Sequence, residues 1–155
     1  MRRRPALIWI FVVALVPTLS LAQNLPANPQ LAGFTLGSTQ QQVVSALGRP
    51  DTILDADSLN FRVLQYPARG VSFMVYKPTA VVTVITVVSP NADSLAGIAI
   101  GSPHTELITR WGTPIHAEGT RLRYGSNSWM LIVDLTEPQT TIRRISLTKV
   151  YAFQY

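Results

Sequence analysis

Residues 31–50 read LAGFTLGSTQQQVVSALGRP, and 64 residues later the chain reads LAGIAIGSPHTELITRWGTP over residues 95–114. Seven of the 20 aligned positions are identical without a gap, where chance gives roughly one, so the pattern indicates an internal duplication. Weaker matches continue it, pairing 64–66 with 122–124 and 71–75 with 129–133. The sequence therefore predicts two units, 31–90 and 91–155, which follow a leader at 1–22 and a flexible tether at 23–30.

Each unit is predicted to open with a short helix. Serine is placed as the N-cap in both units, because its hydroxyl accepts a hydrogen bond from an otherwise unpaired amide. A Gly-x-Pro sequence ends each helix, since glycine permits the left-handed turn and proline prevents the helix from resuming. These signals are Ser38, Gly48 and Pro50 in the first unit, and Ser102, Gly112 and Pro114 in the second.

Strand patterns fill the rest of each unit. Segments rich in β-branched and aromatic residues lie between Pro and Gly turns, at 60–66, 71–76 and 81–88 in the first unit. Their copies are 120–124, 128–134 and 141–150. Helices of this length need a surface to pack on. We therefore expect an α+β fold, with two tandem repeats of one helix plus a three-stranded antiparallel sheet.

The repeated motif resembles a known family. Gly33, Gly37-Ser38 and Leu47-Gly48-Arg49-Pro50, followed by a Leu-x-Tyr strand, are similar to the SmpA/OmlA (BamE-like) outer-membrane lipoprotein domain. Repeated in tandem, the motif resembles the β-lactamase inhibitor protein architecture. The resemblance implies a non-enzymatic protein that assists envelope assembly or inhibits an enzyme by contact. Those lipoproteins carry an acylated cysteine after the leader, and this chain has no Cys, so no lipid anchor is expected.

The N-terminus has the pattern of a secretory signal peptide. Three arginines precede an apolar stretch, and Ser20-Leu21-Ala22 is a small-residue cleavage site. We expect cleavage after Ala22 and a location in the periplasm or outside the cell. From Gln23 onward, 10 Lys and Arg against 8 Asp and Glu leave a net charge of +2. There is no concentrated basic stripe, so no nucleic-acid partner is expected.

No catalytic or metal-binding motif is found. His104 and His116 lack a nearby nucleophile in the pattern of a triad and are interpreted as surface residues at the helix ends. Asp51, Asp55 and Asp57 lack the glycine turn and distal glutamate of a calcium loop and are interpreted as a solvated loop. We predict a protein that is not an enzyme, with no metal and no cofactor.

The strand alternation indicates a second apolar surface. If Val71 and its alternate neighbours face the helix, then Met74 and Tyr76 face away, and the copy places Met130 and Ile132 in the same way. An apolar centre with aromatic, methionine and arginine side chains is typical of a protein interface. The alternative is that the two units, or two chains, bury this face. The predicted protein-binding residues are Arg62, Tyr66, Met74, Tyr76, Arg123, Tyr124, Met130, Ile132 and Arg144.

Two points stay open in this prediction. A register error of one residue exchanges the two faces, so Tyr66 and Tyr124 point either inward or outward. The chain also ends with Tyr151, Phe153 and Tyr155 in alternation, which is compatible with a last strand, an edge for strand addition or, less well, the end of an outer-membrane barrel.

The predicted function is that of an exported binding module whose partner is another envelope or secreted protein, with self-association left open. An envelope assembly factor of the BamE-like type is the alternative. A small-ligand binder or hydrolase is the third hypothesis.

Overall fold

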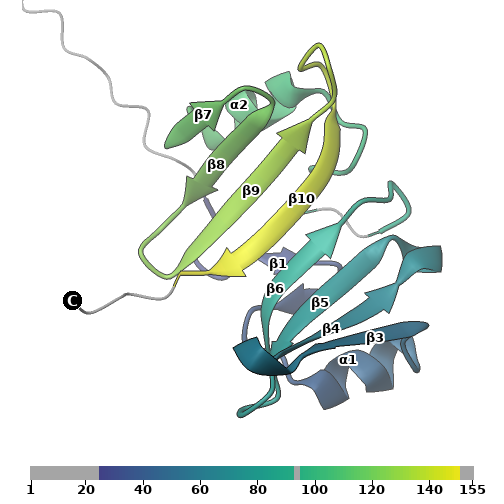
Figure 1. Ribbon diagram of the computed structural model, residues 1–155. Helices are drawn as coiled ribbons and strands as arrows, with labels where there is room; N and C mark the ends of the chain where they lie inside the picture. The colour runs from purple at the N-terminus through teal and green to yellow at the C-terminus, as the bar shows by residue number, and fades with distance from the viewer. Residues whose placement is uncertain (1–24, 93–94, 151–155) are drawn as a thin grey trace, which may run out of the picture.

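The protein is built on one eight-stranded antiparallel sheet, seen in a computed structural model that describes residues 25–92 and 95–150 (Figure 1). The strand order across the sheet is β3-β4-β5-β6-β10-β9-β8-β7. In that order the strands are β3 Thr52–Ala56, β4 Phe61–Tyr66, β5 Val71–Tyr76, β6 Val81–Val87, β10 Ile142–Lys149, β9 Trp129–Leu135, β8 Arg121–Gly125 and β7 His116–Glu118. The described α-helices are α1 (Gln40–Leu47) and α2 (His104–Trp111). Two-residue strands β1 (Gln30–Leu31) and β2 (Phe34–Thr35) form a separate hairpin, and 3-10 turns η1 (Asp57–Leu59) and η2 (Pro67–Arg69) join strands.

The predicted fold class is therefore wrong. The structure is mostly β, and it contains a single continuous sheet in place of two tandem units of a helix plus a three-stranded sheet. Each half contributes four strands, because β3 and β7 each precede the three strands that the sequence indicated. The missed strand β3 lies in the Asp51–Asp57 stretch, which was interpreted as a loop because of its three aspartates.

The two halves join at the middle of the sheet. Strands β6 and β10 pair antiparallel from Val84↔Thr148 to Val87↔Ile145. The hydroxyl oxygens of Thr86 and Ser146 lie 3.1 Å apart across this junction. The halves therefore meet edge to edge through backbone hydrogen bonds, and not face to face.

The repeated glycine and serine positions hold the loop before each helix against the sheet. The Gly37 amide donates to the Val82 carbonyl (2.8 Å), and the Val82 amide donates to the Ser38 carbonyl (2.8 Å). In the second half, Gly101 and Ser102 bond the backbone of Ile142 in the same way, at 2.7 and 3.0 Å. Glycine suits these positions because Gly37 and Gly101 have φ of +92° and +90°, and serine recurs because both hydroxyls accept from a backbone amide three residues earlier, at 3.2 and 3.3 Å.

The helix N-caps lie one residue later than predicted. In α1 the cap is Thr39, whose hydroxyl accepts from the Gln42 amide (3.1 Å) while the Gln42 side chain accepts from the Thr39 amide (2.7 Å). The Ser38 hydroxyl instead accepts from the amide of Thr35 (3.2 Å). In α2 the cap is Pro103, which offers no side-chain hydrogen bond. The serines stabilise the turn before each helix rather than the helix itself.

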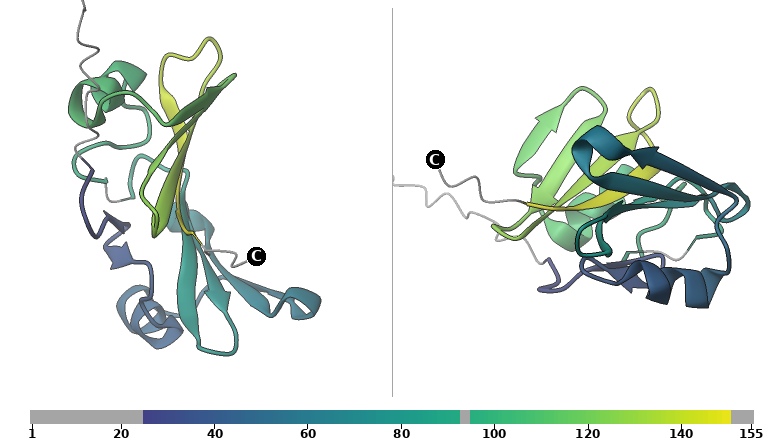
Figure 2. Two further views of the ribbon diagram at one scale, coloured as in Figure 1. Left: turned by 90° about the vertical axis from the view of Figure 1, so that its left-hand side faces the viewer. Right: turned by 60° about the horizontal axis from the view of Figure 1, so that its bottom comes forward.

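Both helices lie on the same side of the sheet, and the hydrophobic core lies between them and the sheet (Figure 2). Val43 of α1 and Leu107 and Trp111 of α2 are buried there. The sheet contributes alternate side chains of its strands, among them Leu64, Phe73, Ile85, Leu122, Leu131, Val133, Ile145 and Leu147.

Several predictions about the ends of the chain fall outside the described residues. These are the signal peptide at 1–22 and the aromatic segment at 151–155. Within the predicted tether, Leu25 packs against the core and Gln30 belongs to β1. Across residues 25–92 and 95–150, no helix has the length and apolar character needed to cross a membrane.

Candidate functional site

The candidate site is the sheet face opposite the helices, which no other described element covers (Figure 2). We call it the open face. In β5, Val71, Phe73 and Val75 are buried, whereas Met74 and Tyr76 are half-buried on the other side. This confirms the predicted alternation. Because the two halves meet edge to edge, they do not bury the open face against each other.

An apolar row crosses the open face from one half to the other. The antiparallel registers place its members directly opposite one another on successive strands. In order across the sheet they are Val63, Met74, Val84, Thr148 and Met130, all apolar except Thr148. Cross-strand neighbours of this kind lie within side-chain contact. The predicted residues Met74 and Met130 thus belong to one surface, although they come from different repeats.

The two halves of the open face differ in charge. At three repeat-equivalent positions, the first half has Val63, Gln65 and Val84 where the second half has arginine. Those arginines are Arg121, Arg123 and Arg144. The open face of the first half is apolar and aromatic around Met74 and Tyr76, where the rings of Phe61 and Tyr76 are in contact at 5.4 Å. Its next row is polar, formed by Gln65, Ser72 and Thr86. The second half is cationic.

A buried carboxylate organises the cationic half. Asp134 is 3% exposed, and its two oxygens accept hydrogen bonds from Nε of Arg121 and Nε of Arg144, both at 2.7 Å. Burial by itself raises the pKa of Asp134, but the hydrogen bonds from the two arginines outweigh it and hold that pKa below its ordinary value. Asp134 therefore stays ionised at neutral pH and fixes both guanidinium groups on the open face.

Arg123 lies on the same face, next to Ile132, with which it pairs across β8 and β9. Its Nε is buried and has no hydrogen-bond partner among the described residues. With Ile132 and Met130 beside it, Arg123 completes a surface of apolar side chains among arginines. Arg121 and Asp134 were not among the predicted site residues. The strand alternation that placed Met130 and Ile132 on this face also places Asp134 there.

Arg62 does not belong to the open face. It has the same parity in β4 as the buried residues Leu64 and Tyr66, so it lies on the helix-side face. Its Nε donates to Asp55 of β3 at 2.9 Å. The predicted role of Arg62 at the rim of the binding surface is therefore corrected.

Tyr66 and Tyr124 are core residues and cannot contact a partner at the open face. They are 3% and 0% exposed. The Tyr66 hydroxyl donates to the Gly48 carbonyl at 3.0 Å, but the Tyr124 hydroxyl has no partner among the described residues. Burial raises the pKa of Tyr124 to about 12. Both halves therefore have a buried tyrosine ring at this position, but only in the first half does its hydroxyl make a hydrogen bond.

We expect opposite effects from removing the two hydroxyls. Tyr66→Phe should lower the free energy of unfolding by about 1 kcal/mol because it removes a hydrogen bond and leaves the Gly48 carbonyl unpaired. Tyr124→Phe should raise it by about 1 kcal/mol because it removes a buried hydroxyl that has no partner. Urea denaturation of both variants measures this. A loss of stability in Tyr124→Phe would show that its hydroxyl is bonded in solution.

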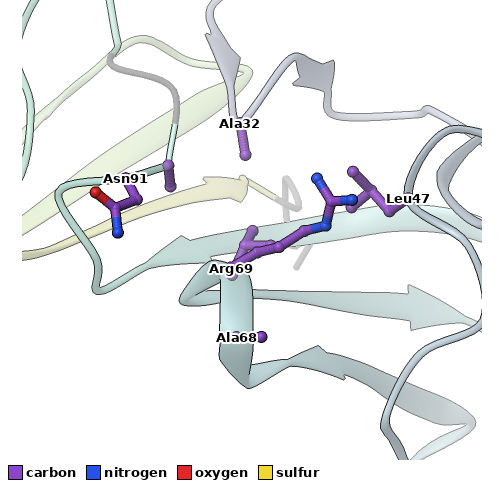
Figure 3. Close-up of a pocket in the computed structure, with 7 residues that line it drawn as sticks. Ala32, Leu47, Ala68, Arg69 and Asn91 are labelled. Atoms are coloured by element: carbon purple, nitrogen blue, oxygen red, sulfur yellow. The ribbon is translucent and has the colours of Figure 1, made fainter.

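A small pocket lies on the helix side, where Ala32, Leu47 and Asn91 come together around the Arg69 side chain (Figure 3). Its volume is about 210 Å³, which is below the usual range for a small-molecule site. Arg69 extends from η2 toward Leu47 and is the charged residue of the lining. Arg69 and Asn91 with apolar neighbours do not form a nucleophile and base pair.

The remaining titratable residues that the structure describes lie at the surface or in ion pairs. His116 is 54% exposed and lies 3.8 Å from a Glu118 oxygen, at the edge of the sheet. Two of the three aspartates interpreted as a loop are paired with cations, Asp55 with Arg62 and both Asp55 and Asp57 with Lys77. Among the described residues, no cluster of three or more His, Asp or Glu side chains is arranged to hold a metal ion.

Comparison with known proteins identifies the fold but no family. No protein-family model matches the chain, and no curated protein sequence matches it. A cysteine-rich secretory protein from Staphylococcus aureus Mu50 superposes with a TM-score of 0.63 at 10% identity, over 80% of this chain and 46% of that one. An extracellular protein containing an SCP domain, from Bacillus anthracis Ames, superposes with a TM-score of 0.50 at 9% identity, over 73% of this chain and 43% of that one. A DUF4309 family protein from Bacillus subtilis 168 has a TM-score of 0.50 at 18% identity, over 73% of this chain and 79% of that one.

These matches correct the resemblance inferred from the sequence. The structural neighbours are SCP-containing and DUF4309 proteins, and not SmpA/OmlA, BamE-like or β-lactamase inhibitor proteins. The chain spans less than half the length of the first two neighbours. At these identities the likeness is one of fold, and it does not transfer an activity.

Proposed function

We propose that this chain is an exported, non-catalytic module that binds another protein through the open face of its sheet. The observation that carries the proposal is the apolar row on a face that no described element covers, with Ile132 and Arg123 in the adjoining row and Arg121 and Arg144 in the row beyond. An open antiparallel face normally carries polar side chains. Methionine, aromatic and arginine side chains are enriched at protein interfaces.

Export is supported by two independent features. The N-terminal residues have the charge, apolar stretch and small-residue site of a secretory signal peptide. Two of the structural neighbours are described as extracellular or secretory proteins. The proposed location is the periplasm or the exterior of the cell, without a lipid anchor, because the chain has no cysteine to acylate.

The chemistry of the open face defines the partner that fits it. Arg121 and Arg144 are held by Asp134 but remain 46% and 43% exposed, so each keeps donors available to a second acceptor. The partner proposed is a protein with an apolar patch bordered by carboxylates. The apolar row would supply the buried centre, and the arginines would set orientation and specificity.

We expect Met130→Asp combined with Ile132→Asp to lower the affinity for this partner about tenfold or more, because two carboxylates then stand in the apolar centre of the interface. A photo-crosslinking residue that replaces Met74 forms a covalent bond with the bound partner in living cells. The crosslinked product is then seen as a band of higher mass on a gel. The aspartate substitutions are then introduced into that same chain, and the intensity of the band is measured. A matched control is Ile108→Asp, on α2, where Ile108 is 45% exposed on the helix side.

The control separates a specific surface from a general loss of solubility. The proposal requires the crosslinked band to fall in the open-face variant and to persist in the Ile108→Asp variant, with unchanged thermal unfolding of both. Equal loss in both variants, or a crosslink obtained from Ile108 and not from Met74, contradicts the open face as the binding surface.

The other two hypotheses have less support. An assembly factor of the BamE-like type rested on the resemblance that the structural neighbours overturn. A small-ligand binder or hydrolase would need convergent polar groups, and the pocket around Arg69 offers that cation and Asn91 among apolar side chains.

A further inference from the structure

The two outer edges of the sheet are built differently. One edge is β3, five residues long, which pairs with β4 from Thr52↔Gln65 to Ala56↔Phe61 without a register shift. The other edge is β7, three residues long, which pairs with β8. Any edge strand presents backbone donors and acceptors that can pair with another strand, so proteins usually shorten or charge their edges.

The internal repeat shows which edge is protected. The 64-residue spacing aligns Thr52, Ile53 and Leu54 of β3 with the sequence His116-Ala117-Glu118 of β7. Their pairing partners correspond as well, since Leu54 lies opposite Val63 and Glu118 opposite Arg121. The second unit therefore has a short, polar edge, whereas the first has a long edge with Ile53 44% and Leu54 50% exposed.

The single charge within β3 does not protect this edge. Asp55 is bonded to Arg62 at 2.9 Å and lies 3.4 Å from Lys77. Lys77 also pairs with Asp57. The carboxylate of Asp55 is thus neutralised within its own chain. Among the described residues, β3 pairs with β4 alone, so its outer edge is available.

We propose that β3 pairs with β3 of a second copy of this chain, antiparallel and about a two-fold axis at Leu54. This register places Leu54 opposite itself, Thr52 opposite Ala56, and Ile53 opposite Asp55, so apolar or uncharged side chains fill one face of the junction. It also places Asp51 opposite Asp57, whose carboxylate is paired with Lys77.

Neighbouring registers are less favourable. An axis at Ile53 places Asp51 opposite Asp55, and an axis at Asp55 places that carboxylate opposite itself. Carboxylates also lie opposite each other about the axis at Leu54, at Asp51 and Asp57, so like-charge repulsion does not decide the register; the number of residues paired does. Only the axis at Leu54 pairs all five residues of β3. A two-fold contact brings the same surface of both chains together, so this register uses the whole strand in each copy.

Pairing at this edge has two consequences. Because the other edge is protected, association stops at two copies. The continuous sheet keeps both open faces on the same side, so a dimer would present two binding surfaces together. The dimer does not depend on the proposed function, because the substitutions that test binding are at Met130 and Ile132 in β9, several strands away from β3. Leu54 itself lies opposite Val63 on the open face, so only the β9 variant is used to test the binding of the other protein.

The oligomeric state tests the proposal directly. The chain from Gln23 retains every described residue. It is expected to sediment as a dimer at about 100 µM, which corresponds to a dissociation constant in the micromolar range. Leu54→Glu, which copies the residue of the protected edge, is expected to sediment as a monomer with unchanged unfolding temperature. Ile115→Glu, at an apolar residue 58% exposed beside the other edge, is expected to remain a dimer.

Cysteine substitution tests the register, because the chain has no native cysteine. Opposite residues of an antiparallel pair have Cα atoms about 4.5–5.5 Å apart, which a disulfide spans. Leu54→Cys should therefore give a crosslinked dimer under mild oxidation. Thr52→Cys should not, because the proposed register separates the two copies of residue 52 by about 13 Å along the strands.

Three results would overturn the proposal. One is a monomeric wild-type chain at 100 µM or above. Another is a dimer that Leu54→Glu leaves intact. The third is efficient crosslinking of Thr52→Cys with none of Leu54→Cys, which would place the axis elsewhere.

Discussion

Replacing Trp111 by alanine is expected to lower the free energy of unfolding by about 4 kcal/mol, the usual cost of removing a large aromatic side chain from a core. Trp111 is 1% exposed, in the last turn of α2, and its ring meets that of Tyr124 at 5.7 Å in a T-shaped contact. The substitution leaves a cavity between the helix and the sheet. Because α2 is only eight residues long, it depends on this packing to stay helical.

The duplication supplies a matched control for this prediction. Leu47 occupies the same position in α1 but is only half-buried, so Leu47→Ala should cost about 1–2 kcal/mol. Trp111→Leu, which introduces the residue of the first unit, should fall between the two alanine variants. Urea denaturation followed by circular dichroism measures all three. Equal losses for Trp111→Ala and Leu47→Ala would contradict the view that α2 depends more heavily on one side chain.

The helices could be predicted because their signals are local. Gly48 and Gly112 end helices whose last residues are Leu47 and Trp111, as the Gly-x-Pro sequences indicated. The caps were misplaced by one residue because Ser38 is also suited to bonding the turn before the helix, and only the structure shows that it bonds the Thr35 amide.

The strand count and the order of strands could not be predicted in the same way. The stretch from Asp51 to Asp57 has the composition of a loop, and β3 forms there because β4 pairs with it and because Arg62 and Lys77 neutralise its acids. The contact between β6 and β10 joins residues about 60 positions apart, and no local pattern specifies it. A motif of glycines, serine and proline was therefore shared with a family whose architecture this chain does not have.

The faces of the strands were predicted where the alternation is clean. Met74, Tyr76, Met130 and Ile132 lie on the open face because their neighbours on each strand are apolar and buried. The parity of Tyr66 was undecided in the sequence, since β4 carries polar and apolar side chains on both faces. Tyr66 is buried beside Phe73 of the adjacent strand β5, on the same face, with the two ring centroids 6.1 Å apart.

Gly70→Ala is expected to lower the free energy of unfolding by about 3 kcal/mol, from a strained backbone and a steric clash together. Gly70 ends η2 with φ +62°, a left-handed conformation that alanine adopts at a cost of about 1 kcal/mol. A Cβ at this position would lie 2.1 Å from Cβ and 2.9 Å from the backbone N of Ser89. Because the Val88 amide donates to the Gly70 carbonyl at 2.9 Å, the turn cannot move away without losing that bond.

Gly119→Ala separates the clash from the strain. Gly119 has φ +53°, but no atom lies within 4 Å of the position its Cβ would take, so its substitution should cost about 1 kcal/mol from strain alone. Denaturation midpoints of the two variants give the difference. If Gly70→Ala lowers the free energy of unfolding no more than Gly119→Ala does, then Ser89 moves aside at little cost. The end of β6 would then be held less tightly against the β4–β5 turn than the hydrogen bond from Val88 implies. A cost well above that of Gly119→Ala means that the close approach of two loop backbones, and not left-handed φ alone, requires glycine at position 70.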